Sequence, residues 1–173
     1  MFSILLSLWV GFMTHISSSF SSVPVQPVVS YVFMAVECPI SQKYIFRLND
    51  LNQRYPDMNI VGVFQDDISP EGLSAFKKRF DVEIPLIVDK NHQLAREFKA
   101  EITPEVFLVD RFQRVLYSGA IDNWFISLGR NRSAPSVHYL EEAFLSYRRG
   151  EDIKRKKTKA IGCFLEINPV HRH

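Results

Sequence analysis

Residues 103–110, TPEVFLVD, decide the fold that this sequence predicts. Pro104 stands just before an apolar run, 106–109, whose composition is typical of a buried strand. Proline cannot donate a ladder hydrogen bond, so a proline that opens a strand needs a reason to be there. An X-Pro bond adopts the cis form far more readily than other peptide bonds, and a cis turn exposes neighbouring backbone groups. The stretch therefore predicts a strand entered through an exposed turn at Thr103–Pro104.

Strands and helices alternate along the rest of the chain. Runs rich in β-branched and aromatic residues predict strands at 28–36, 58–64, 84–89, 106–110 and 114–119. Helical spacing of apolar residues predicts helices at 40–55, after Ser69, after Asn91, and from Ser136 to Gly150, with these three polar residues as N-caps. Residues 120–135 read as a loop. The early alternation predicts parallel strands, and the late hairpin makes the sheet mixed.

Cys38 follows the first predicted strand and precedes the first predicted helix, with Pro39 in the first turn. Free N–H groups and the dipole at a helix start stabilise a thiolate, which lowers the pKa of a cysteine. Such a cysteine is a candidate nucleophile. An inert buried cysteine explains the same placement, and the position alone does not choose between the two.

Several stretches together resemble a known family: CPISQKY at 38–44, GVF at 62–64, PLIVD at 85–89, LAREF at 94–98, TPEVFLVD, and YSGAID at 117–122. They resemble the redoxin branch of the thioredoxin-like superfamily, which includes alkyl hydroperoxide reductase-type peroxiredoxins and exported thiol-disulfide oxidoreductases. The resemblance runs from Val28 to Cys163 and implies an α/β, thioredoxin-like fold with a mixed central sheet of about five strands flanked by helices.

The resemblance also implies site residues and an activity. Cys38 is implied as the redox-active residue, and Pro104, preceded by Thr103, as a cis-proline that presents backbone to a partner. The implied activity is thiol-disulfide exchange with a thiol or disulfide protein, with no cofactor. Two departures bear on this: Ser41 stands where dithiol thioredoxins have a second cysteine, and Ala35 where peroxiredoxins have threonine. The second departure weakens the alternative of a thiol peroxidase.

A lone redox cysteine needs a thiol to resolve its adducts, and Cys163 is the candidate in this chain. It lies 125 residues downstream of Cys38, and Gly162 before it allows a close backbone approach. The pair is a redox couple, a permanent disulfide, or two distant cysteines; the sequence leaves all three open. A further alternative is a non-catalytic binding module, or a copper site made by Cys38, Cys163 and His138.

Residues 1–24 precede the predicted domain. MFSILLSLWVGFM is continuously apolar and HISSSFSS follows it, the pattern of a secretory signal, although no Lys or Arg comes first. We expect a signal-like or anchor segment at 1–24, a redoxin domain at 25–166 and a tail at 167–173. The protein is then exported, periplasmic or membrane-anchored, facing an oxidising compartment; the alternative is an apolar segment packed on the domain.

Composition limits the other possibilities. The chain is 46% apolar with a formal net charge of +2, which argues for a globular domain and gives no basis for a nucleic-acid partner. Two cysteines make no disulfide framework, and their spacing does not fit a zinc site. The sequence leaves the oligomeric state open.

Overall fold

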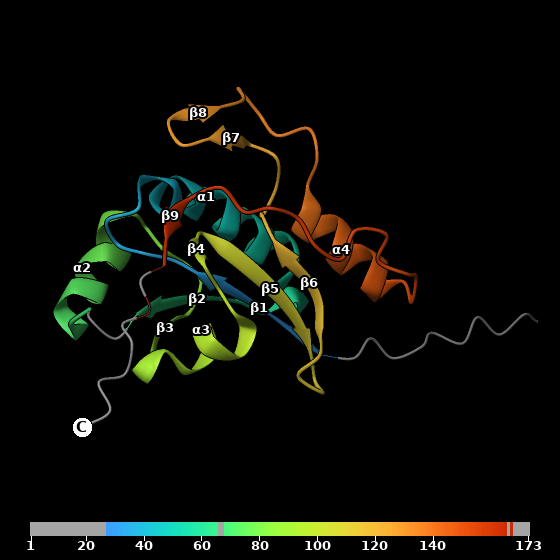
Figure 1. The fold of residues 1–173 in the computed structure, drawn as a ribbon, viewed down its shortest axis with the longest axis horizontal. Coiled ribbons are helices and arrows are strands. Elements are labelled where there is room, and N and C mark those ends of the chain that lie inside the picture. The colour runs from blue at the N-terminus through green and yellow to red at the C-terminus, as the bar shows by residue number, and fades with distance from the viewer. Residues whose placement is uncertain (1–26, 66–67, 166, 168–173) are drawn as a thin grey trace, which may run out of the picture.

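The computed structural model of the protein describes residues 27–65, 68–165 and 167. At its centre is a five-stranded sheet in the order β3-β2-β1-β5-β6 (Figure 1). The central strands are β1 (Val28–Phe33), β2 (Ile60–Gln65), β3 (Leu86–Asp89), β5 (Glu105–Asp110) and β6 (Val115–Gly119). β1 pairs in parallel with β2, and β2 with β3, whereas β5 is antiparallel to both β1 and β6. The predicted mixed sheet of about five strands is therefore confirmed.

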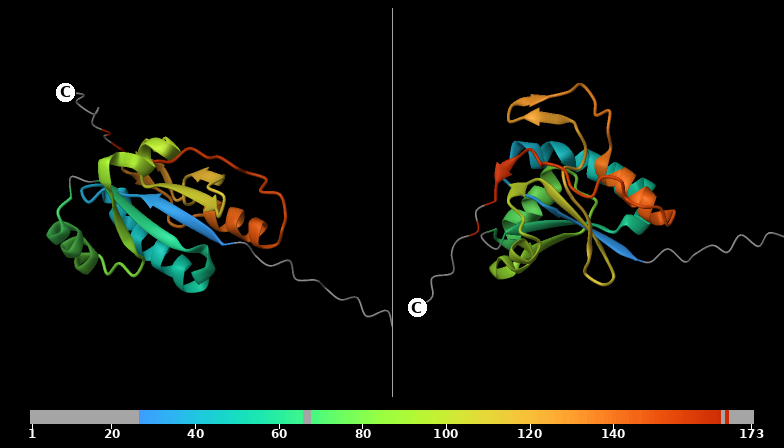
Figure 2. Two further views of the ribbon diagram at one scale, coloured as in Figure 1. Left: turned by 90° about the horizontal axis from the view of Figure 1, so that it is seen from below. Right: turned by 45° about the vertical axis from the view of Figure 1, so that its right-hand side comes forward.

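Helices cover both faces of this sheet (Figures 1 and 2). They are α1 (Pro39–Arg54), α2 (Pro70–Arg79), α3 (Gln93–Phe98) and α4 (Tyr139–Arg148), with short 3-10 turns at η1 (Pro56–Met58) and η2 (Lys90–His92). Side chains alternate along β5: Leu108 packs in the core shared with α1 and α4, while Phe107 packs in a second core with α3. The sheet is thus apolar on both faces, which explains the continuous apolar runs of its central strands.

Helix α1 begins where the sequence predicts. Pro39 occupies its first turn and Cys38 its N-cap, with extended backbone (φ −81°, ψ 112°). Tyr44, Leu48 and Leu51 are buried at helical spacing against the sheet. The chain direction of β1 and this buried face together hold Cys38 at the carboxyl end of the central strand.

Two predicted helix caps are wrong. Asn91 does not cap α3; the buried Asp89 accepts hydrogen bonds from the N–H groups of Leu94 (2.9 Å) and Ala95 (2.8 Å) instead. A carboxylate at the end of a strand reaches the helix start across the intervening turn, which the local capping pattern does not consider. Ser136 does not cap α4 either: its N-cap is His138, and the Ser136 hydroxyl accepts a hydrogen bond from Asn123.

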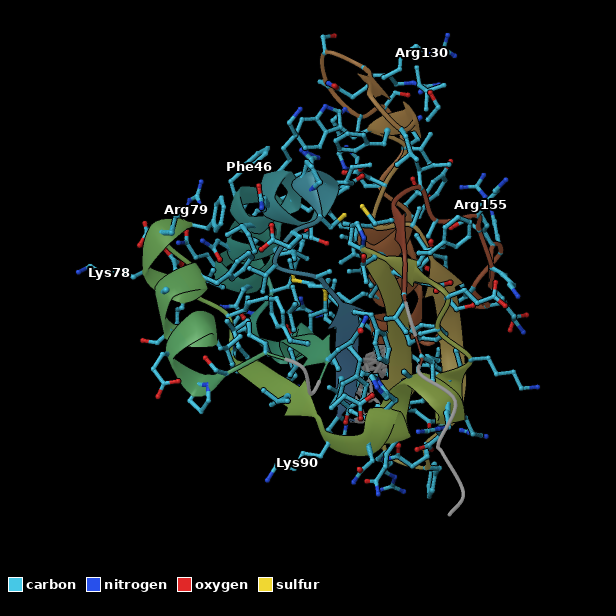
Figure 3. All side chains as sticks on the ribbon, turned by 60° about the vertical axis from the view of Figure 1, so that its left-hand side comes forward. Phe46, Lys78, Arg79, Lys90, Arg130 and Arg155 are labelled. Carbon is cyan, nitrogen blue, oxygen red and sulfur yellow. The ribbon has the colours of Figure 1, made fainter. Side chains whose placement is uncertain are left out.

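The predicted loop at 120–135 is also wrong, because it contains a small hairpin. β7 (Phe125–Ser127) pairs antiparallel with β8 (Arg130–Asn131), and the hairpin projects beyond the start of α1 (Figure 1). Arg130 lies on the outer part of this projection, and Phe46 points outward from α1 (Figure 3). The strands are too short for their periodicity to be visible in the sequence.

The chain after α4 returns along the sheet toward the edge where β1 ends and β5 begins (Figure 2). Ser118 of β6 forms a parallel bridge with Lys157, supported by two backbone hydrogen bonds. The chain then forms β9 (Cys163–Phe164), which pairs antiparallel with β4 (Ile102–Thr103). Neither of these two-residue strands is predicted from the sequence, and both lie at the site described below.

The predicted signal-like or anchor segment, residues 1–24, lies outside the described residues. Within the part of the chain that the structure describes, no helix has both the length and the apolar character needed to cross a membrane.

Asp89→Ala is expected to lower the free energy of unfolding by about 1–2 kcal/mol, because it removes the side chain that caps α3. Urea unfolding followed by circular dichroism measures the change. Glu97→Ala, an exposed acidic residue on the same helix, is the matched control and is expected to leave stability nearly unchanged. Equal effects of the two substitutions would contradict a capping role for Asp89.

Candidate active site

Cys38 is buried at the start of α1, with 1% of its surface exposed. Two side chains of α1 bind the turn that precedes Cys38. The Gln42 side chain donates a hydrogen bond to the Val36 carbonyl (2.7 Å), and the Ala35 N–H donates to the Ser41 hydroxyl (3.4 Å). Residues of α1 thus hold the backbone of the turn that leads into Cys38.

Thr103 and Pro104 face Cys38 from the other side. The peptide bond between them is cis, and both residues are buried. The Thr103 carbonyl oxygen accepts a hydrogen bond from the Cys38 thiol at 3.1 Å. The stretch that predicts the fold thus supplies a backbone group in direct contact with the candidate nucleophile.

Strand β9 brings Cys163 to the same place. Cys163 lies opposite Thr103 in the β4–β9 pair, and its carbonyl accepts a hydrogen bond from the Thr103 hydroxyl at 3.4 Å. The two sulfurs are 2.8 Å apart, with the Cys163 thiol donating to Cys38. Both cysteines are free thiols in this structure, and a disulfide bond of about 2.05 Å needs only a small shift.

Gly162 makes this approach possible. A Cβ atom at this position would collide with the Thr103 carbonyl group, and would also meet the Ile102 side chain. Any other residue at 162 would push β9 away from β4, and Cys163 with it. The sequence signal of a glycine directly before the distant cysteine therefore has a physical basis in the structure.

The environment makes the two thiols unequal. Burial raises the pKa of Cys38, but hydrogen bonds from Cys163 and from the Ser41 amide and hydroxyl groups outweigh it, so the pKa is lowered overall. Burial, followed by the hydrogen bond and the charge interaction with Cys38, raises the pKa of Cys163 to about 11. The pair therefore favours a Cys38 thiolate that accepts a hydrogen bond from a Cys163 thiol, as the helix-start position of Cys38 predicts.

Ser41 has a role that the sequence reasoning missed. There it was noted only as the absence of a second cysteine, but its side chain is fully buried and acts on Cys38. The signal was available: the N–H of the third helical residue has no partner within the helix and points toward the N-cap side chain.

A small pocket of about 260 Å³ adjoins Pro104, lined in part by Tyr44 and Asp122. The buried Asp122 accepts a hydrogen bond from the Tyr44 hydroxyl and forms an ion pair with Arg47, both at 2.6 Å. Burial, together with the Asp122 charge, raises the pKa of Tyr44 well above its ordinary value, so Tyr44 stays a donor. These contacts fasten the segment after β6 onto α1.

His138 is not brought to the cysteines. Its Nδ1 atom lies 3.4 Å from Arg47, at the N-cap of α4. Among the residues that the structure describes, no three His, Cys, Asp or Glu side chains are arranged so that they could hold a metal ion. Cys38, Cys163 and His138, the residues of the alternative copper site, are therefore not brought together in this structure.

The sequence matches the AhpC/TSA family over residues 14–118, more than half of the chain. The chain belongs to the AhpC/TSA family. This confirms the redoxin resemblance, and the match contains both Cys38 and Pro104. Cys163 and the segment that carries it lie beyond the match. No curated protein matches the chain in sequence.

Solved structures show the same fold at low identity. An uncharacterized conserved protein from Geobacillus kaustophilus (19% identity, TM-score 0.67) covers 83% of this chain and 79% of its own. A hypothetical protein from Sinorhizobium meliloti 1021 (22%, TM-score 0.63) covers 81% and 79%. A thioredoxin-like protein in its oxidised form (17%, TM-score 0.53) covers 73% and 80%. The thioredoxin-like fold implied by the sequence is therefore confirmed.

Gly162→Ala is expected to slow formation of a Cys38–Cys163 disulfide about tenfold or more, because overpacking against the Thr103 backbone displaces β9. Oxidation by a small disulfide, followed by mass spectrometry of non-reduced peptides, measures the rate. Phe164→Ala is the control, since it removes an exposed side chain on the other side of Cys163. If Gly162→Ala and the wild-type protein form the bond equally fast, the close approach is not required.

Cys163→Ala is expected to raise the pKa of Cys38, because it removes a hydrogen bond that favours the thiolate. The ultraviolet absorbance of the thiolate, recorded against pH, measures this shift. In the wild-type protein the same titration should show two steps, the later one near the pKa of about 11 of Cys163. A Cys38 step that does not move in the variant would contradict the coupling of the two thiols.

Proposed function

We propose that this protein is a thiol-disulfide oxidoreductase in which Cys38 attacks and Cys163 resolves. One observation carries the proposal: the two sulfurs lie 2.8 Å apart at the start of α1, next to the Thr103–Pro104 turn. Membership of the AhpC/TSA family supports a redox role for Cys38. The lowered pKa of Cys38 supports it as the attacking thiolate.

The reaction has two steps. The Cys38 thiolate attacks one sulfur of a partner disulfide, which forms a mixed disulfide and releases the other partner sulfur as a thiolate. Cys163, as its thiolate, then attacks the Cys38 sulfur, forms the Cys38–Cys163 disulfide and releases the second partner thiolate. The proton of Cys163 goes to a leaving partner sulfur. A proton from solvent completes the other partner thiol, so the partner disulfide is reduced to two thiols and this chain is oxidised; a dithiol partner reverses both steps.

The alternatives differ in what they require of the site. A binding module requires no reactive thiol, whereas the two sulfurs here lie 2.8 Å apart and the pKa of Cys38 is lowered. A thiol peroxidase of this family has a threonine hydroxyl three positions before its cysteine, and the residue here is Ala35, which has no hydroxyl. Thiol-disulfide exchange with a protein therefore has more support than either alternative.

Cys38→Ala is expected to abolish reduction of a protein disulfide by this chain in the presence of a dithiol reductant. Cys163→Ala is expected to lower turnover at least about tenfold and to accumulate a mixed disulfide on Cys38, because the resolving attack is lost. A coupled turnover assay and intact-mass spectrometry measure the two effects.

His138→Ala is the control and is expected to leave turnover unchanged, since His138 contacts Arg47 and not the sulfurs. Full activity of Cys163→Ala without a trapped adduct would show that the resolving thiol is external. Peroxide consumption by the wild-type protein that exceeds its disulfide reduction would favour the peroxidase.

We also propose that the protein works in an oxidising compartment with a protein thiol or disulfide as its partner. Disulfides persist in such compartments, and the apolar 1–24 segment fits export or membrane attachment. Processing of the segment in cells, followed by mass spectrometry of the purified N-terminus, tests this localisation.

A further inference from the structure

Strand β9 occupies the surface through which a partner would have to reach Cys38. The Cys38 sulfur is enclosed, with Thr103 on one side and Cys163 on the other. In the β4–β9 pair, Thr103 lies opposite Cys163 and Ile102 opposite Phe164. An extended segment with a cysteine facing Cys38 is thus already present at the site, supplied by the chain itself.

Residues 159–164, which we call the strap, are fixed just outside both ends. Before the strap, the Thr158 hydroxyl accepts a hydrogen bond from the Ala120 N–H (2.9 Å) and lies 2.6 Å from the Tyr117 hydroxyl. After the strap, Leu165 is 8% exposed in the α3 core, and its N–H donates to the Glu101 carbonyl (2.8 Å). Between these anchors, the strap is held to β4 through a two-residue ladder. Such short pairing opens at low cost compared with the central sheet.

We propose that the strap is a built-in substitute for the partner: it leaves β4 during the reaction, and an extended, cysteine-containing segment of the partner protein takes its place. The inference rests on the proposed function and names the partner that the same site accepts. Because Thr158 holds the start of the strap, it is the other end, β9, that separates from β4. The partner sulfur then takes the position of Cys163, and Cys38 makes the first attack. Cys163 then returns with the strap and makes the second attack, which releases the partner.

Gly162 defines which segment fits. A partner strand in the same register places the residue before its cysteine against the Thr103 carbonyl group, where a Cβ atom collides. That carbonyl is held in place by the pairing of its own residue. The surface therefore selects partners with glycine directly before the reactive cysteine.

The position after the cysteine is not restricted in this way. Phe164 is 84% exposed and borders two grooves of about 460 and 1170 Å³. A side chain of any size fits at that position. The surface thus selects partners by the residue before the cysteine and not by the residue after it. A change after the cysteine therefore serves as an internal control.

The test uses three short peptides containing Gly-Cys-Phe, Ala-Cys-Phe or Gly-Cys-Ser, each as a mixed disulfide with thionitrobenzoate. Reduced wild-type protein attacks the peptide sulfur and releases the coloured thiolate, so absorbance gives the rate. We expect the Ala-Cys-Phe peptide to react about tenfold or more slowly than Gly-Cys-Phe, and Gly-Cys-Ser to react at about the Gly-Cys-Phe rate. Equal rates for the glycine and alanine peptides would overturn the inference.

A small symmetrical nitrobenzoate disulfide separates this inference from the proposed function. If Cys38 reacts with neither the small disulfide nor the peptides, the proposed function itself fails. If Cys38 reacts with the small disulfide but does not discriminate between the glycine and alanine peptides, only the inference about the strap fails.

Release of the strap is tested with Leu165→Ala, which weakens its far anchor and is expected to raise the rate with the Gly-Cys-Phe peptide severalfold. Leu145→Ala on α4, a partly buried leucine away from the strap, is the matched control and is expected to leave the rate unchanged. An unchanged rate in Leu165→Ala, or an equal gain in both variants, would overturn release of the strap. If Leu165→Ala does not fold, the peptide comparison in the wild-type protein decides the inference.

Discussion

The site depends on one backbone contact, the approach of Gly162 to the Thr103 carbonyl group. That carbonyl also accepts the Cys38 hydrogen bond, while the Thr103 hydroxyl binds the Cys163 carbonyl. A single buried residue therefore contacts both cysteines, and the distance between the sulfurs is set by backbone atoms. The pairing of β4 with β9 holds these backbone atoms, so the two sulfurs lie at reacting distance without a local two-cysteine motif.

The separation of the cysteines in the chain allows the two thiols to differ. Cys38 sits at a helix start, where the Ser41 amide and hydroxyl groups favour its thiolate. Cys163 sits on a short strand beside that thiolate, and its pKa is raised. A negative charge shared between two close sulfurs favours one thiolate at a time. In the proposed reaction, the order of attack, Cys38 first and Cys163 second, matches this difference between the two thiols.

Local patterns predicted most of the fold, because strands buried on both faces and amphipathic helices leave long, regular signals in the sequence. The start of α1 and the turn at Pro104 are predicted by their prolines, since proline suits a first helical turn and interrupts a strand ladder. The contact between Cys38 and Cys163 was only one of three alternatives that the sequence left open, since it joins distant segments through strands of two residues. The Asp89 cap was missed for a related reason: its carboxylate acts on a helix that begins after an intervening turn.

The basic run from Lys154 to Lys159 shows how one segment serves two purposes. Its lysine side chains are exposed. Its backbone, however, pairs with Ser118 along the outer strand β6, so charged side chains cover an edge that would otherwise be free to pair with another chain. Thr158, the one uncharged residue in the run, is tied to Tyr117 and Ala120. The segment that protects the edge therefore also anchors the start of the strap at Thr158. Because the strap is short, this anchor restricts the positions that Cys163 can take relative to Cys38.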